Sequence, residues 1–125
     1  MGKGYLIDSN AMMDAQSKKL PVHGLKFVAD IINEDFTISF VSYIEFLGYR
    51  NATRSMEEFA AIATVIETNK AIIDTTIKLR KKHRIKLPDA IIAATALVYG
   101  RTLITRNTVD FYDIEGLKIV NPWNI

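Results

Sequence analysis

The sequence contains no cysteine, and its 125 residues include only three prolines and six glycines. The lack of cysteine excludes a disulfide scaffold, thiolate catalysis and cysteine-ligated zinc. With 49% hydrophobic residues, the chain is neither collagen-like nor disordered in composition. No apolar run approaches the ~20 residues that span a bilayer, and Asp8 comes too early for a secretory signal peptide. We therefore expect one cytoplasmic domain over residues 1–125, with no membrane contact.

Short apolar segments alternate with helical patterns along the chain. Apolar, β-branched composition predicts strands at residues 5–7, 36–41, 102–105 and 117–120, with a shorter one near 65–67. Apolar spacing predicts helices over 22–32, 55–67, 70–83 and 87–99. The third should turn Ile73, Ile77 and Leu79 or Arg80 inward, and the fourth should be surrounded by other elements. This alternation indicates parallel βαβ units, hence a three-layer α/β/α sandwich around a central, mainly parallel sheet.

Four acids stand at predicted helix starts. Asp8, Glu45 and Asp110 each follow a predicted strand, and Asp89 follows Pro88 at the start of the most apolar helix. Taken singly, each acid is explained as helix capping, with Ser42 and Glu45 as a capping box and Asn107 as the cap before Asp110. Together they lie where an open parallel sheet binds its ligands, at the carboxyl ends of its strands.

Four ionised carboxylates in one pocket require a cation. At ~4 Å and an effective dielectric of ~20, each pair repels by ~4 kcal/mol. An oxygen-only ligand set favours Mg2+ or Mn2+ over zinc, and His23 and His83 have no spacing typical of zinc ligands. Such a pocket favours phosphate chemistry, and the absence of a glycine-rich phosphate loop argues against a nucleoside triphosphate or dinucleotide substrate. Metal-assisted phosphodiester hydrolysis is the leading interpretation.

The sequence also resembles the PIN-domain ribonucleases, in particular the single-domain toxins of VapC type. The resemblance covers almost the whole chain. It rests on four segments: YLIDSN, SYIEFLGY, LPDAIIAATALVYG and TLITRNTVDF followed by GLKIVNP. The resemblance implies a Mg2+-dependent endoribonuclease with Asp8, Glu45, Asp89 and Asp110 around the metal.

The resemblance also implies supporting residues and partners. Asn10 and Asn107 match family positions that orient the site, and Ser9 replaces a more usual threonine while keeping the hydroxyl. The implied partners are an RNA substrate, an antitoxin protein whose tail obstructs the acids, and a second copy in a homodimer.

Basic residues suggest where RNA would be held. When the four acids are left out, the chain has 16 lysines and arginines and ten acids, a net charge of +6. Arg50, Arg54, Arg101 and Arg106 are the candidates for RNA contact because each lies close to one of the four segments. The basic run at residues 78–86 is interpreted more readily as a solvated helix end than as a phosphate-binding edge.

Two other functions stay open. A phospho-acceptor receiver domain has similar length and an acidic Mg2+ pocket, but it should show adjacent acids after the first strand, where this chain has Asp8 between Ile7 and Ser9. A PIN-like module that binds RNA or protein without cutting is the second alternative, and the four intact acids disfavour it.

Overall fold

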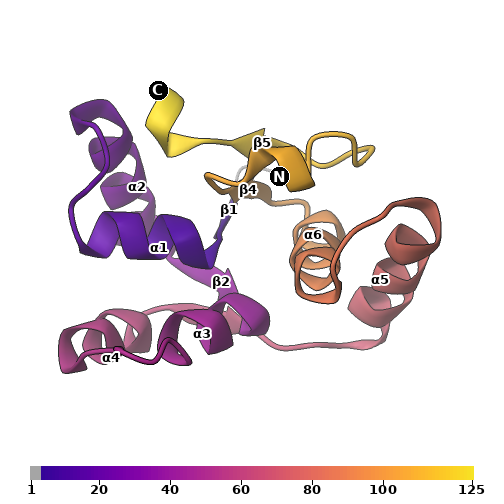
Figure 1. Ribbon diagram of the computed structural model, residues 1–125, viewed down its shortest axis with the longest axis horizontal. Helices are drawn as coiled ribbons and strands as arrows, with labels where there is room; N and C mark the ends of the chain where they lie inside the picture. Colours follow the sequence, from indigo (N-terminus) through magenta and orange to yellow (C-terminus); the bar gives the residue numbers. More distant parts are fainter. Residues whose placement is uncertain (1–3) are drawn as a thin grey trace.

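The structure, a computed structural model, describes residues 4–125, so the first three residues of the predicted domain lie outside the described range. Five strands, six helices and two 3-10 turns follow one another through these residues (Figure 1). In chain order they are β1 (Tyr5–Ile7), α1 (Ser9–Gln16), α2 (Val22–Asp35), β2 (Thr37–Ser39), α3 (Phe40–Leu47), α4 (Arg54–Ala61), β3 (Thr64–Ile66), α5 (Lys70–Lys82), α6 (Leu87–Tyr99), β4 (Thr102–Ile104), η1 (Thr108–Asp110), β5 (Ile119–Val120) and η2 (Pro122–Asn124).

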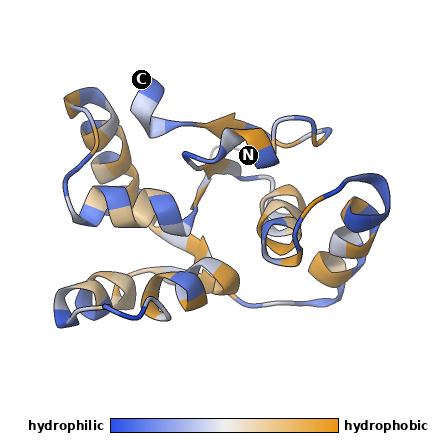
Figure 2. Cartoon of the chain, in the orientation of Figure 1, coloured by the Kyte–Doolittle hydropathy of each residue, from blue (hydrophilic) through white to orange (hydrophobic). Residues whose placement is uncertain are grey.

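The strands lie between two helical layers, as the sequence predicts. Helices α1 to α4 occupy one side of the strands and α5 and α6 the other (Figure 1). Successive strand residues point to opposite faces of a sheet, so Leu6 and Leu103 pack into the core beneath α5 and α6. Their neighbours Ile7 and Ile104 pack into the core beneath α1, α2 and α4. Both faces are covered, and the strands are mostly apolar, although β2, β3 and β4 each begin with a threonine and β2 ends with a serine (Figure 2).

The order of the strands reverses direction at β1. Parallel strands β1, β4 and β5 pair in that order, and β2 pairs in parallel with β3. Strand β2 also lies against β1, so the chain runs outward from β1 in one direction to β2 and β3, and later in the other direction to β4 and β5. Ligands bind at such a reversal, outside the carboxyl ends of the strands.

Helix α6 is the central helix that its composition predicts. It begins with Pro88 in its first turn, and residues 92–96 are all buried. Gly100 ends it with a φ of 63°, a left-handed conformation that glycine adopts at little cost. None of the helices in residues 4–125 is long and apolar enough to cross a membrane.

The predicted strand at 36–41 and the helix start after it are wrong in detail. Strand β2 ends at Ser39, and Phe40 already belongs to α3. The Ser39 hydroxyl accepts a 3.0 Å hydrogen bond from the amide of Ser42, so Ser39 caps the helix. The proposed capping box of Ser42 and Glu45 is therefore wrong, because both residues lie inside α3.

The inward face of α5 differs from the prediction at Ile73 and Ile77, whereas the burial of Leu79 is confirmed. Ile72, Thr76 and Leu79 are buried, whereas Ile73 and Ile77 are 47% and 49% exposed.

The bounds of two other elements also differ. The helix predicted over 55–67 ends at residue 61 and leaves room for β3, which begins one residue earlier than predicted. The helix expected from residue 107 onward is only the 3-10 turn η1.

Candidate active site

Asp8 lies at the carboxyl end of β1 and is the N-cap of α1. Only 4% of this residue is exposed, and its carboxylate accepts four hydrogen bonds. The donors are the amide of Ser9 at 2.8 Å, the hydroxyls of Thr105 at 2.9 Å and Ser42 at 3.5 Å, and the side-chain amide of Asn10 at 3.3 Å. Burial raises the pKa of Asp8, and these hydrogen bonds oppose the rise.

Thr105 and Ser42 contact Asp8, but the sequence reasoning did not assign either residue to the site. Ile7 pairs with Ile104 in the parallel ladder, so Thr105 follows β4 directly beside Asp8. The same hydroxyl accepts a hydrogen bond from the amide of Asn107 at 3.0 Å. A polar residue at the end of a predicted strand is the only signal that the sequence offers for Thr105, and the strand pairing identifies its partner.

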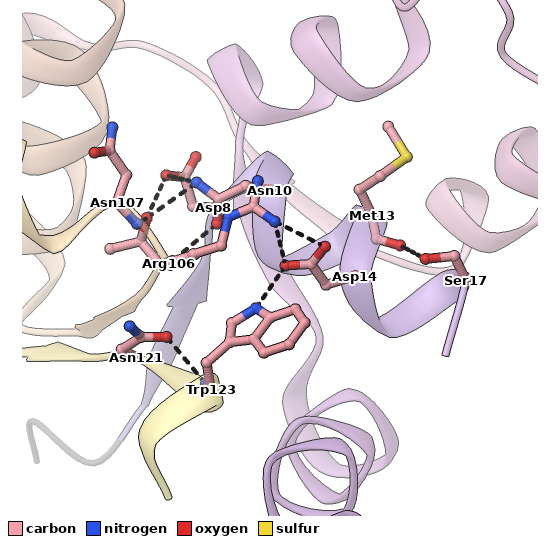
Figure 3. Close-up of polar contacts among 10 residues, drawn as sticks. Asp8, Asn10, Met13, Asp14, Ser17, Arg106, Asn107, Asn121 and Trp123 are labelled. Carbon is pink, nitrogen blue, oxygen red and sulfur yellow. Dashed lines mark hydrogen bonds and ion pairs between the residues drawn. The ribbon is translucent and has the colours of Figure 1, made fainter. Parts of the chain in front are cut away.

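The three predicted orienting residues all contact a site acid. Asn10 contacts Asp8 as described, and the hydroxyl of Ser9 donates to Glu45 Oε1 at 3.0 Å. The side-chain amide of Asn107 donates to Asp110 Oδ2 at 2.7 Å. Figure 3 shows the side chains of Asn10 and Asn107 together with Asp8. Each of these three side chains therefore restricts the orientation of one carboxylate.

Glu45 reaches the site from within α3, not from a helix start. It is the sixth residue of that helix, and its side chain meets Ser9 at the start of α1. Partial burial raises the pKa of Glu45, the hydrogen bond from Ser9 lowers it, and the charge of Asp8 raises it further.

Asp89 shows that the four acids share one electrostatic environment. It lies in the first turn of α6 and is partly buried. Its pKa rises to about 6, and burial is the largest cause. Repulsion by the other three acids adds to the rise, most strongly from Asp8, then Asp110, then Glu45. Lys86 opposes this rise. The fold thus brings together the four acids selected from the sequence.

A small cleft opens beside two of these acids. It has a volume of about 100 Å³ and is lined by Arg84, Ile85, Lys86, Asp89 and Asp110. The basic run at 78–86, interpreted from sequence as a solvated helix end, therefore contributes two cations to the edge of the acidic site.

The chemistry of the donors fits a hard divalent cation. The site provides carboxylate and hydroxyl oxygens, the ligand types of Mg2+ and Mn2+. Burial and, after it, repulsion by the other acids raise the pKa of Asp89. In the side-chain arrangement of residues 4–125, no three His, Asp or Glu side chains are placed to hold a metal ion as they stand.

The arginines chosen from the sequence have other contacts. Arg101 lies at the opposite end of β4 from Thr105, where it pairs with Asp35 at 2.8 Å, and its contact with RNA stays a prediction. The guanidinium of Arg106 is held by the carboxylate of Asp14. Arg54 pairs with Glu58 on α4, and Arg50 is exposed between α3 and α4.

The chain is similar to one known domain family and to several solved structures. The PIN domain model matches residues 5–117. A toxin-antitoxin complex from Klebsiella pneumoniae contains a chain that is 29% identical, with a TM-score of 0.77, 98% of this chain covered and 100% of that one. VapBC-1 from nontypeable Haemophilus influenzae is 25% identical, with a TM-score of 0.77 and coverages of 97% and 98%.

VapBC2 from Rickettsia felis, solved bound to a DNA fragment from its promoter, has the same fold at 20% identity and a TM-score of 0.73, with coverages of 94% and 97%. No curated protein matches the sequence. The resemblance seen in the four sequence segments is thus confirmed, and the α/β architecture is that of the matching structures. Since the matching model spans nearly all of the described residues, the chain belongs to the PIN domain family.

Proposed function

We propose that this PIN-domain protein is a metal-dependent endoribonuclease and the toxin of a toxin-antitoxin pair. One observation carries the proposal: the fold brings Asp8, Glu45 and Asp110 close enough to Asp89 that, besides burial, their charges raise its pKa. A site that repels its own charges favours a divalent cation, and a cation held by acids favours a phosphate substrate.

The four acids would hold Mg2+ or Mn2+, listed in chain order as Asp8, Glu45, Asp89 and Asp110. When bound, such a cation activates water and neutralises the charge on the phosphate oxygens. The chain itself supplies orientation. Four hydrogen bonds fix the carboxylate of Asp8, Ser9 holds Glu45, and Asn107 holds Asp110. These contacts restrict the orientations of three of the four carboxylates that would hold the cation.

The charges around the cleft favour a nucleic-acid substrate, which we propose to be RNA. Arg84 and Lys86 line the cleft on the side of Asp89, where they can contact backbone phosphates without reading sequence. Their cationic groups also attract a polyanion to a pocket that would otherwise repel it.

Two apolar surfaces support the proposed protein partners. A groove of about 330 Å³ between α1, α2 and α4 includes Leu25, Ile32 and Phe59, and we assign it to the antitoxin, since similar structures are toxin-antitoxin complexes. The exposed residues Ile73 and Ile77 on α5 border a second groove of about 210 Å³, which we assign to homodimer contact. A cytoplasmic location stays a prediction.

The test is cleavage of a mixed cellular RNA pool with Mg2+. The wild-type chain should give discrete fragments, and Asp8→Asn or Asp89→Asn should give none. Asp30→Asn, which changes an exposed acid on α2, is the matched control and should cut normally. Cleavage that survives in both site variants, or in EDTA, contradicts the proposal.

Neither alternative function gains support. The family match replaces the receiver-domain interpretation, whose fold is different. A silent RNA-binding module would bind RNA tightly and show no Mn2+ binding, so a Mn2+ titration separates it from the enzyme.

A further inference from the structure

Asp14 is a buried carboxylate that belongs to none of the four acids of the site. It lies on α1 and is only 4% exposed. Two residues from distant parts of the chain donate to it (Figure 3). Nη1 of Arg106 lies 3.1 and 3.0 Å from its two oxygens, and Nε1 of Trp123 lies 2.9 Å from Oδ2.

These contacts explain how a charge is kept inside the protein. A buried carboxylate is strongly unfavourable unless it is paired and hydrogen-bonded, and here a guanidinium and an indole N–H satisfy it. Arg106 follows β4, whereas Trp123 lies in η2 near the end of the chain. Asp14 therefore ties together three segments that are separate in sequence.

The network continues from Arg106 to the catalytic site. The main-chain amide of Arg106 donates to Oδ1 of Asn10 at 3.0 Å. The other end of that Asn10 side chain donates to Asp8 Oδ2 at 3.3 Å and to the Thr105 hydroxyl at 3.2 Å. Arg106 is thus held at its backbone by the residue that contacts Asp8, and at its guanidinium by Asp14.

We infer that Asp14 is a positioning residue, which holds Arg106 and through it keeps Thr105 and Asn10 directed at Asp8. This inference rests on the proposed metal-dependent function. Residues that orient a metal ligand typically affect metal affinity or activity by about 10- to 100-fold when changed. A residue that only stabilises the fold would not change metal affinity in the folded protein.

The carboxyl-terminal turn supplies the second donor to Asp14. The side chain of Asn121 accepts from the amide of Trp123 at 3.0 Å, which fixes the turn. Helix α2 lies directly against it, since a Cβ added to Gly24 would be 1.8 Å from the carbonyl oxygen of Pro122. Trp123 is the single tryptophan of the chain, so its fluorescence reports on the network.

The experiment compares Mn2+ binding by calorimetry in four proteins: wild type, Asp14→Asn, Trp123→Phe and Asp35→Asn. The last is a matched control, because Asp35 also pairs with an arginine at about the same distance but at the other end of the sheet. We expect Asp14→Asn to weaken Mn2+ binding by about 10- to 100-fold and Trp123→Phe by a smaller factor. Asp35→Asn should bind Mn2+ like the wild type, and urea unfolding of each protein records any loss of stability.

The outcomes separate this inference from the proposed function. Unchanged Mn2+ affinity in folded Asp14→Asn overturns the positioning role and leaves the nuclease proposal standing. If Asp14→Asn does not fold, Trp123→Phe decides, because it removes one donor and keeps the ion pair; unchanged affinity there overturns the inference. A wild-type chain that neither binds Mn2+ nor cleaves RNA overturns the proposed function and this inference with it. In the wild type, Mg2+ should also change the fluorescence of Trp123, and Asp14→Asn should abolish that change.

Discussion

Replacing Asp89 by asparagine should stabilise the metal-free protein at neutral pH. Asp89 has a pKa of about 6 in the folded chain, compared with 3.8 for an ordinary aspartate. The folded state therefore binds this proton more tightly than the unfolded state does. Consequently the free energy of unfolding falls as pH rises from about 4 to about 6, and the penalty persists above that range. Asparagine keeps the shape of the side chain and removes the charge.

The size of the effect follows from the pKa. The difference between 3.8 and about 6 corresponds to about 3 kcal/mol of unfavourable interaction at neutral pH. Asp89 is partly exposed, so solvent screening reduces this to about 1 to 2 kcal/mol. The favourable effect of an acid in the first turn of α6, about 0.3 to 1 kcal/mol, opposes the gain. A net stabilisation of about 1 kcal/mol remains.

Urea denaturation in EDTA, at pH 4.5 and pH 7.5, measures this difference. We expect the Asp89→Asn protein to unfold at higher urea than the wild type at pH 7.5, and at nearly the same urea at pH 4.5. Asp30→Asn is the control, since it removes only an exposed ion pair with Lys26, worth about 0.2 to 1 kcal/mol. Adding Mg2+ should reverse the order, because only the wild type retains all four ligands. Equal or lower stability of Asp89→Asn at pH 7.5 without metal would refute the reasoning.

Four further substitutions test other parts of the structure. Thr105→Val removes a buried hydroxyl that both donates and accepts, and it should lower the free energy of unfolding by about 1 to 3 kcal/mol in urea denaturation. Gly24→Ala places a methyl group against the carbonyl oxygen of Pro122, so we expect a loss of about 1 to 3 kcal/mol and a changed tryptophan emission. Arg84→Ala and Lys86→Ala should each weaken RNA binding and reduce the slope of log affinity against log salt by about 1; an unchanged slope excludes phosphate contact.

The local sequence was sufficient to predict the layers and to select four acids that the fold brings close together. Strand β1 and helix α6 begin where apolar composition, Pro88 and the acids predict, since these signals act within a few residues of the chain. It was not sufficient for the start of α3, because Ser39 and Ser42 are both good caps and only the observed hydrogen bond distinguishes them. The prediction of the buried face of α5 failed for a similar reason. Rotating the helix by one residue about its axis buries Ile73 in place of Ile72, and the two faces are almost equally hydrophobic.

The sequence by itself determined an acidic pocket in a basic α/β domain, because composition, strand-end acids and helix signals are all local properties. Only the tertiary structure decided which neutral groups surround those acids. Thr105 meets Asp8 through the pairing of β1 with β4, and Asp14 meets Arg106 and Trp123 across more than 90 residues of chain. Such contacts depend on strand register and packing between layers, which no stretch of sequence encodes alone.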